Sequence, residues 1–135
     1  MRNVTVVDGR GHTVVKDVSF EARAGEVLGI AGVQGNGQTE LIKSLLGVIR
    51  PDAGTILVDG RDISAHGPKE SLETGIGYIP EDRSHDGFVG AFSVRENLVL
   101  DLYRNDEFSK GLALRLDNIA KNAAARIEEF DIRTE

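Results

Sequence analysis

Apolar and polar residues alternate at the beginning of the chain. Residues 3–7 read as a strand, and residues 8–11 form a tight-turn signal with two glycines. A second alternating run places four apolar residues mostly on one face: Val14, Val18, Phe20 and Ala22. This pattern predicts an antiparallel hairpin that buries one face.

The spacing then changes from a short continuous apolar run to a helical repeat. Residues 27–31 are apolar at Val27, Leu28, Ile30 and Ala31, a run too short for a helix, which predicts a buried parallel strand. A glycine-rich turn follows at 32–37. After it, apolar residues recur at helical spacing: Leu41, Ile42, Leu45, Leu46 and Ile49. The pattern therefore predicts a strand, a glycine turn and the beginning of a helix.

The middle of the chain carries several turn signals. Residues 55–58 read as a strand that meets the hairpin dipeptide at 59–60, with a short return strand at 62–63. Pro68 suits the first turn of a short helix and Gly75 its end. Residues 77–80 predict a short buried strand closed by proline.

The last third predicts a charged loop and two helices. Residues 81–90 are charged and contain glycine, which predicts an exposed loop. Ser93 and Glu96 have the spacing of a capping box, so a helix should begin at Val94. A final helix is marked by one apolar face that has few obvious partners in the chain: Ile119, Ala120, Ala123, Ala124, Ile127 and Phe130.

Composition bounds the fold class and the partners. A length of 135 residues with 40% apolar and 28% charged residues suits one soluble α/β domain with its own core. The formal net charge of −6 argues against a nucleic-acid partner. There is no cysteine, which excludes a disulfide framework and a thiolate metal site. The chain has no run of about eighteen apolar residues, which a membrane-spanning helix would need. Any link to a membrane should therefore come through a partner.

The glycine-rich turn has the context of a phosphate-binding loop. Glycines let successive backbone N–H groups converge, and a helix N-terminus adds further donors and the positive end of its dipole. The candidate phosphate-binding residues are Gly32, Val33, Gln34, Gly35, Asn36, Gly37, Gln38, Thr39 and Glu40. They match GxxxxGK[ST] except at Gln38, which replaces the lysine.

The exchange of lysine for glutamine should weaken the site. Hydrogen bonds to charged groups contribute about 1.5–3 kcal/mol and neutral ones about 1, so nucleotide affinity should fall by about tenfold or somewhat more. Phosphoryl transfer should suffer too, because charge develops on the β- and γ-phosphate oxygens. The carboxylate of Glu40 suits the helix dipole but would lie near phosphate charge.

Other polar residues are weaker candidates. Asp59 and Asp101 each follow an apolar run in the manner of a magnesium-binding aspartate, but Asp59 lies in a hairpin turn and Asp101 on a predicted helix. The three histidines stand singly and should face solvent: His12, His66 and His85. Residues 81–83 follow a predicted strand, where α/β proteins place their sites, but they also suit an ordinary solvated loop.

Several segments in order and spacing resemble the nucleotide-binding domains of ABC transporters. They are the hairpin with KDVSF, the AGE turn, the loop GVQGNGQTEL, the hairpin from Ala53 to Ile63, GYIPEDR and SVRENL. The resemblance covers essentially the whole chain. It implies a P-loop NTPase-like cassette in which residues 1–135 are the N-terminal part: an antiparallel β subdomain, the phosphate-loop portion of the core and the start of the helical subdomain.

The GNGQTE loop and PEDR look like the second, degenerate cassette of importer ATPases for simple sugars and nucleosides. This resemblance implies ATP and Mg²⁺ as ligands, with Thr39 and Glu81 on the metal side. Glu81 stands where most cassettes carry a glutamine, and the adenine-stacking aromatic expected near Gly9 is absent, with His12 or Arg10 as weaker substitutes. The LSGGQ-type signature and the later catalytic residues are not in these 135 residues, so the chain should not hydrolyse ATP alone.

The resemblance also implies partners. Two cassettes close face to face on ATP, and a membrane permease docks on residues 81–92, with Phe88, Val89 and Phe92 as apolar contacts unless these pack locally instead. The chain would then be peripheral on the cytoplasmic face of the membrane. Two other functions stay open: a nucleotide-free structural module that keeps the cassette fold, and a small nucleotide-dependent enzyme of another phosphate-loop family.

Overall fold

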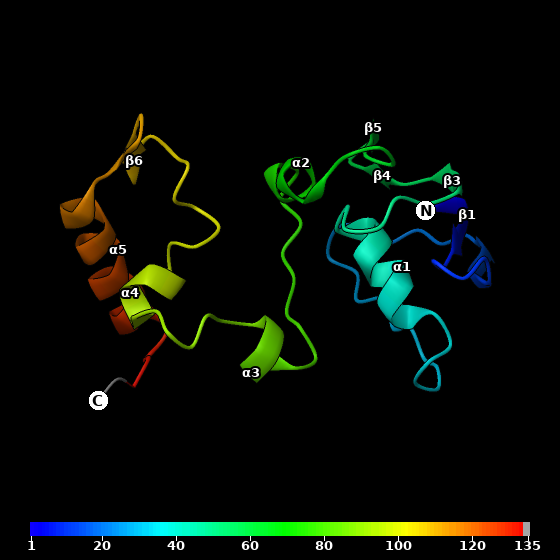
Figure 1. Ribbon diagram of the computed structural model, residues 1–135, viewed down its shortest axis with the longest axis horizontal. Coiled ribbons are helices and arrows are strands. Elements are labelled where there is room, and N and C mark those ends of the chain that lie inside the picture. Colours follow the sequence, from blue (N-terminus) through cyan, green and yellow to red (C-terminus); the bar gives the residue numbers. More distant parts are fainter. Residues whose placement is uncertain (134–135) are drawn as a thin grey trace. The chain divides into compact units, whose positions relative to one another are not determined.

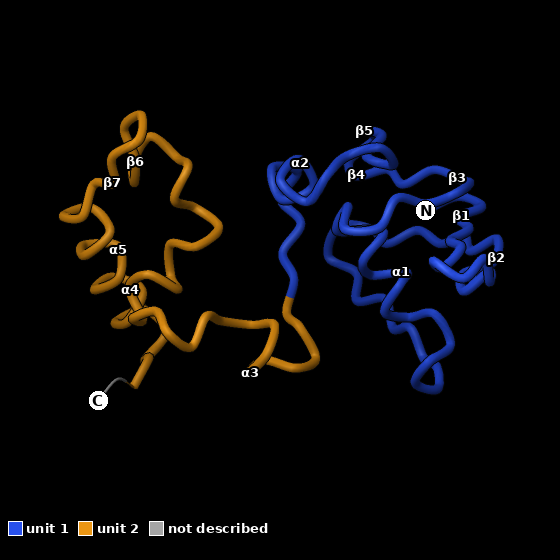
Figure 2. Tube along the Cα trace, in the orientation of Figure 1, with its two compact units in different colours: residues 1–78 blue, residues 79–135 orange. Residues whose placement is uncertain are grey.

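The structure is a computed structural model that describes residues 1–133. It consists of two compact units, unit 1 from Met1 to Tyr78 and unit 2 from Ile79 onward (Figure 2). Each unit has a hydrophobic core of its own.

Unit 1 is built on an antiparallel three-stranded sheet. Strand β1 (Arg2–Val7) lies in the middle, between β2 (Thr13–Val18) and β3 (Ala53–Thr55) (Figure 2). The predicted hairpin of β1 and β2 is confirmed. Strand β3 takes Thr55 from the strand predicted at 55–58 and adds Ala53 and Gly54 before it. Gly54 has φ of +89° and a Cβ there would clash with the Asn3 carbonyl, so glycine permits this pairing.

The core of unit 1 packs α1 (Gln38–Leu45) against the sheet. Its buried residues are Val4, Val6, Val15, Leu41, Ile56 and Ile63. The sequence placed Val14 on the buried face, but the buried residue is Val15, whereas Val14 is half-buried. The register of β1 and β2 shifts twice, between Val4 and Val6 and between Val6 and Val7, and such irregularities change which side chain faces the core.

The remaining turn predictions in unit 1 are confirmed. Strands β4 (Leu57–Val58) and β5 (Arg61–Asp62) form the short hairpin, with Asp59 and Gly60 both at positive φ. Helix α2 (Pro68–Glu73) begins at the proline, and Gly75 just beyond it has φ of +89°. Helix α1 ends at Leu45, so Ile49 lies beyond it in a turn.

Two predicted buried strands are absent. Residues 27–31 and 77–80 have no strand geometry, and Val27 and Ile79 are 97% and 87% exposed. A strand exists only where a neighbour pairs with its N–H and C=O groups, and no strand of the described residues pairs with either segment. The apolar residues of both segments favour burial, but no element within residues 1–133 covers them.

The described part of unit 2, residues 79–133, contains three helices and one hairpin. The helices are α3 (Arg83–Asp86), α4 (Val94–Asn97) and α5 (Leu116–Glu129), and β6 (Ser109–Lys110) pairs with β7 (Ala113–Leu114) (Figure 1). The start of α4 at Val94 and the final helix are confirmed. The exposed loop at 81–90 includes the single turn of α3, and the hairpin of β6 and β7 was not predicted. Its strands have two residues each, too short for a pattern of alternation.

The core of unit 2 joins α5 to the segment after α4. Its buried residues are Val99, Phe108 and Ile119, and Ala123 on α5 is also buried. The expectation that the apolar face of α5 has few partners is therefore wrong for the first half of the helix. It holds near the end, where Phe130 is 64% exposed.

Within residues 1–133, no helix combines the length and the apolar content that crossing a membrane requires.

Candidate functional site

The glycine-rich loop lies directly before α1, as the sequence predicts. Residues 34–37 form a turn, and Gly35 and Gly37 have φ of +88° and +91°, a region that favours glycine. Gly37 is the N-cap of α1, and the Leu41 N–H donates to its carbonyl at 2.9 Å. The loop and helix of the predicted phosphate site are therefore present, although the strand expected before them is not.

Gly37 is fixed against the sheet. It is buried, and a Cβ on it would clash with the Val14 carbonyl oxygen of β2. Only a residue without a side chain allows this approach of the loop to the strand. The sheet thus positions the start of α1, and with it the rest of the loop.

The side chain of Gln38 folds back and bonds to the backbone of the glycine-rich loop. Its side-chain Nε2 donates a hydrogen bond to the Val33 carbonyl at 3.1 Å, and the Asn36 N–H donates to the same oxygen at 3.2 Å. The amide lies so close to Gly32 that a Cβ there would clash with it. The position that carries lysine in GxxxxGK[ST] thus holds a neutral side chain that is folded onto the loop backbone.

The backbone donors of the loop fit an anion. Within residues 1–133, no acceptor is recorded for the N–H groups of five residues around the helix start: Gly35, Gly37, Gln38, Thr39 and Glu40. Free N–H groups and the positive end of a helix dipole favour a phosphate. The carboxylate of Glu40, half-buried in the first turn of α1, opposes a second negative charge there.

The two residues predicted for the metal lie in different units. Thr39 is exposed on α1 in unit 1, and Glu81 is exposed near the start of unit 2. The described residues contain no group of three or more histidine, cysteine, aspartate or glutamate side chains placed to hold a metal ion. The pairing of Thr39 with Glu81 stays a prediction.

The segment 81–92 presents apolar side chains to solvent. Asp82 caps α3, because its carboxylate accepts from the Ser84 and His85 N–H groups at 3.0 Å each. Beyond the helix, Phe88, Val89 and Phe92 are 51%, 38% and 46% exposed. The alternative that these three side chains pack into a local core is wrong.

One residue that the sequence analysis missed holds this segment in shape. The Val89 N–H donates to Asn97 Oδ1 at 2.7 Å, and Asn97 Nδ2 donates to the carbonyls of Val89, Phe92 and Ser93 at 3.1, 3.2 and 3.2 Å. We call this set of bonds the Asn97 clamp. An asparagine at the end of a four-residue helix could have indicated this role, because its side-chain amide can bond to backbone groups that have no partner within the helix.

The capping box of α4 lies next to the clamp. Glu96 accepts from the Ser93 N–H at 2.7 Å and from the Ser93 hydroxyl. The hydroxyl of Ser93, followed by its N–H, holds the pKa of the Glu96 carboxyl below its usual value. The predicted box is confirmed.

The weaker candidates have ordinary surroundings. His12 and His85 are exposed, as expected, but His66 is half-buried and its Nδ1 has no partner among the described residues, so the expectation of a solvent-facing side chain is wrong for it. Asp59 lies in the β4–β5 turn. Asp101 lies in a turn beyond α4 and not on the helix.

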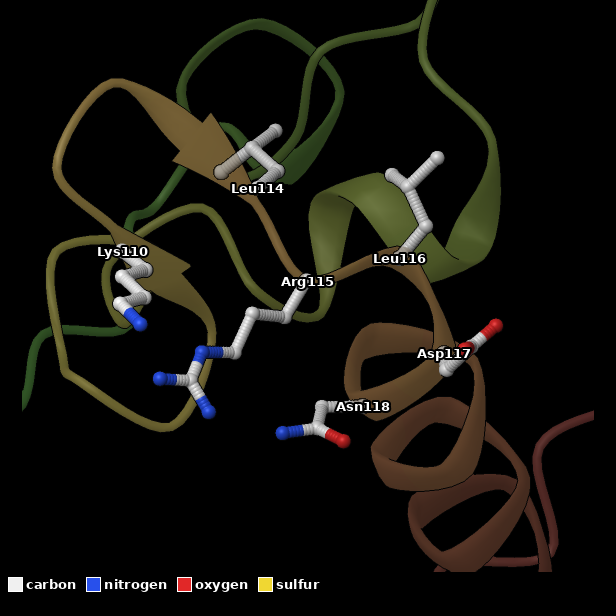
Figure 3. A pocket seen from close by; sticks show the side chains of 6 residues that line it. All are labelled: Lys110, Leu114, Arg115, Leu116, Asp117 and Asn118. Atoms are coloured by element: carbon white, nitrogen blue, oxygen red, sulfur yellow. The ribbon is translucent and has the colours of Figure 1, made fainter.

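An open pocket in unit 2 has a volume of about 630 Å³ (Figure 3). Its lining residues are Lys110, Leu114, Arg115, Leu116, Asp117 and Asn118. Asn118 is already engaged, because its Nδ2 donates to the Glu107 carbonyl at 2.7 Å. None of the predicted site residues lines this pocket, and we assign no function to it.

Residues 15–134 match the sequence profile of the ABC transporter family. The guanosine import ATP-binding protein NupO of Bacillus subtilis is 42% identical over 131 residues, which are 97% of this chain and 26% of that protein. The nucleoside import ATP-binding protein NupA of Lactococcus lactis subsp. cremoris is 38% identical over 133 residues, 98% of this chain and 26% of that protein.

The glucose import ATP-binding protein TsgD13 of Haloferax volcanii is 39% identical over 132 residues, 98% of this chain and 24% of that protein. The chain thus spans about a quarter of the length of these curated relatives. The family match covers both the glycine-rich loop and the Asn97 clamp. The chain therefore belongs to the ABC transporter family and has the α/β, P-loop NTPase fold of its ATP-binding cassette.

Proposed function

We propose that this chain is an ATP-binding part of an importer for a nucleoside or a simple sugar. The observation that carries the proposal is the glycine-rich loop before α1 in a chain of the ABC transporter family, where five N–H groups around the helix start have no acceptor among residues 1–133. Guanosine, nucleoside and glucose import are named for the three similar proteins. Residues 1–135 would form the N-terminal part of one cassette.

The nucleotide site would be the degenerate one of a pair. Residues 32–40 would hold the phosphates through backbone N–H groups, and Gln38 would give up its bond to Val33 or share it. Since the glutamine brings no charge, the site would bind ATP weakly. A partner cassette would supply the chemistry.

Mg²⁺ would be held from the Thr39 hydroxyl and the Glu81 carboxylate. Both are oxygen donors, which suit a hard cation that also binds the phosphates. When bound, the ion would neutralise phosphate charge. This chain alone would not hydrolyse ATP, because the carboxylate that positions water in related cassettes would come from elsewhere.

A membrane permease would dock on residues 81–92. The exposed side chains of Phe88 and Phe92 offer apolar contact area. Three carboxylates precede them, Glu81, Asp82 and Asp86, against the single arginine Arg83. Cytoplasmic loops of membrane proteins carry an excess of lysine and arginine, so the charges are complementary. The chain would thus be peripheral on the cytoplasmic face of the membrane.

Calorimetric titration with Mg-ATP tests the nucleotide part of the proposal. We expect weak, saturable binding without turnover by the chain alone. No binding even at millimolar ATP would favour a structural module that keeps the cassette fold without nucleotide. Turnover by residues 1–135 alone would favour the alternative of a nucleotide-dependent enzyme of another phosphate-loop family.

A further inference from the structure

We infer that Asn97 is a positioning residue for partner docking. Its bonds to residues 89, 92 and 93 hold the backbone of the segment that carries the exposed side chains of Phe88, Val89 and Phe92. The inference rests on the proposed docking of a membrane permease on residues 81–92, and it names the side chain on which that docking depends.

The Asn97 clamp supplies hydrogen-bond partners to a backbone segment that is not paired with a strand. The Val89 N–H and carbonyl both bond to the Asn97 amide, at 2.7 and 3.1 Å, in the way that a neighbouring strand would bond to them. No strand among the described residues pairs with Val89. A single side chain therefore replaces a strand as the partner of this segment.

The same amide also ties the segment to the helix that follows it. Asn97 Nδ2 donates to the carbonyls of Phe92 and Ser93, both at 3.2 Å. The Phe92 N–H donates to the Val89 carbonyl at 2.9 Å, which closes a turn between the two apolar residues. Residues 89 and 92 are thus fixed to each other and to α4 through one residue.

The clamp is more than packing support. Asn97 is half-buried and is absent from the core cluster of unit 2, which consists of Val99, Phe108 and Ile119. The apolar side chains in the segment that it holds stay 38–51% exposed, so their ordering leaves much apolar surface in solvent. Ordering a loop before binding reduces the entropy that binding must overcome, which raises affinity for the partner.

The first test measures the shape of the segment in the 135-residue chain without a partner. Hydrogen exchange of the Val89 amide should accelerate by at least about tenfold in Asn97→Ala, because its acceptor is gone. Asn118→Ala is the matched control, since it removes a side-chain bond to the Glu107 carbonyl in the same unit. It should leave the Val89 amide unchanged. Equal protection of Val89 in wild type and Asn97→Ala would overturn the inference.

The second test measures docking. The probe is the membrane permease that works with the guanosine import ATP-binding protein of Bacillus subtilis, held in nanodiscs of phosphatidylethanolamine and phosphatidylglycerol. We expect Asn97→Ala to weaken binding by about fivefold or more, and Asn118→Ala to leave it unchanged. Asn97→Asp keeps the size and the oxygen acceptor but loses the N–H donors, so it carries the test if the alanine variant does not fold.

A double-mutant cycle separates positioning from general stability. In a background with Phe88→Ala, Val89→Ala and Phe92→Ala, the change at Asn97 should cost almost nothing further, because the side chains that it positions are gone. Additive losses would overturn the positioning role. Unchanged binding by both Asn97 variants would overturn it while leaving the docking proposal intact. No binding by the wild-type chain would overturn the docking proposal, and the positioning role with it.

Discussion

The side-chain amide of Gln38 donates a hydrogen bond to the carbonyl oxygen of Val33, five residues earlier, at 3.1 Å. The glutamine thus points back onto the loop that precedes its own helix and not into solvent. Where the phosphate-loop pattern has a cation, this loop has a neutral donor that is already used. Nucleotide affinity should therefore depend on what stands at this position.

Replacing Gln38 by lysine should raise affinity for Mg-ATP by about tenfold, because a charge-assisted bond replaces a neutral one. Isothermal titration calorimetry measures the change. Gln34→Lys is the matched control, since it adds the same charge to the same loop at a position that the pattern leaves free. An equal gain in both variants would mean that net charge alone, and not the geometry of position 38, sets the affinity.

Gly37 and Gly35 separate two costs of a side chain in the loop. Both have positive φ, which costs about 1–2 kcal/mol for an alanine. Only Gly37 also packs against the Val14 carbonyl, whereas nothing lies within 4 Å of a Cβ on Gly35. Gly37→Ala should therefore destabilise unit 1 by about 1–3 kcal/mol more than Gly35→Ala does, as measured by urea denaturation. Equal losses would show that the loop relaxes away from β2.

The capping box should give unit 2 a pH dependence. Because the folded-state pKa of Glu96 is lowered, its contribution to stability is fully present above its unfolded value, near 4.5, and is lost as pH falls through the lower folded value. Urea midpoints of wild type and Glu96→Gln should therefore converge as the solution is acidified below that value. A constant difference between the two midpoints across that range would contradict the role of the carboxylate.

The two halves of α5 should respond differently to truncated side chains. Ile119 is 4% exposed against Val99 and Phe108, so Ile119→Ala should cost about 2–4 kcal/mol. Phe130 is 64% exposed, so Phe130→Ala should change the free energy of unfolding by no more than about 0.5 kcal/mol. Thermal unfolding of the two variants compares them directly. A large loss at Phe130 would show that the end of the helix is covered.

Much of the local structure could be predicted because its causes lie within a few residues. The hairpin signal at Asp59 and Gly60, the proline of α2 and the Ser93 to Glu96 capping box each gave the observed element. The glycine loop before α1 was found in the same way, because the glycines at 35 and 37 are required by the backbone itself. The Asn97 clamp was not predicted, since its bonds depend on how a loop without periodicity folds back over eight residues.

The sequence by itself determined the β4–β5 turn, the starts of α2 and α4, and where the phosphate loop stands. Only the tertiary structure decided which apolar residues are buried. Val15 is buried in the core, whereas Val14 only packs against it partly buried, because the register of β1 and β2 shifts. Ile119 packs with Val99 and Phe108. Val27 and Ile79 stay exposed although the sequence pattern placed both in buried strands. Turns and caps arise from bonds between near neighbours, whereas a strand or a buried face exists only when a distant segment pairs with it.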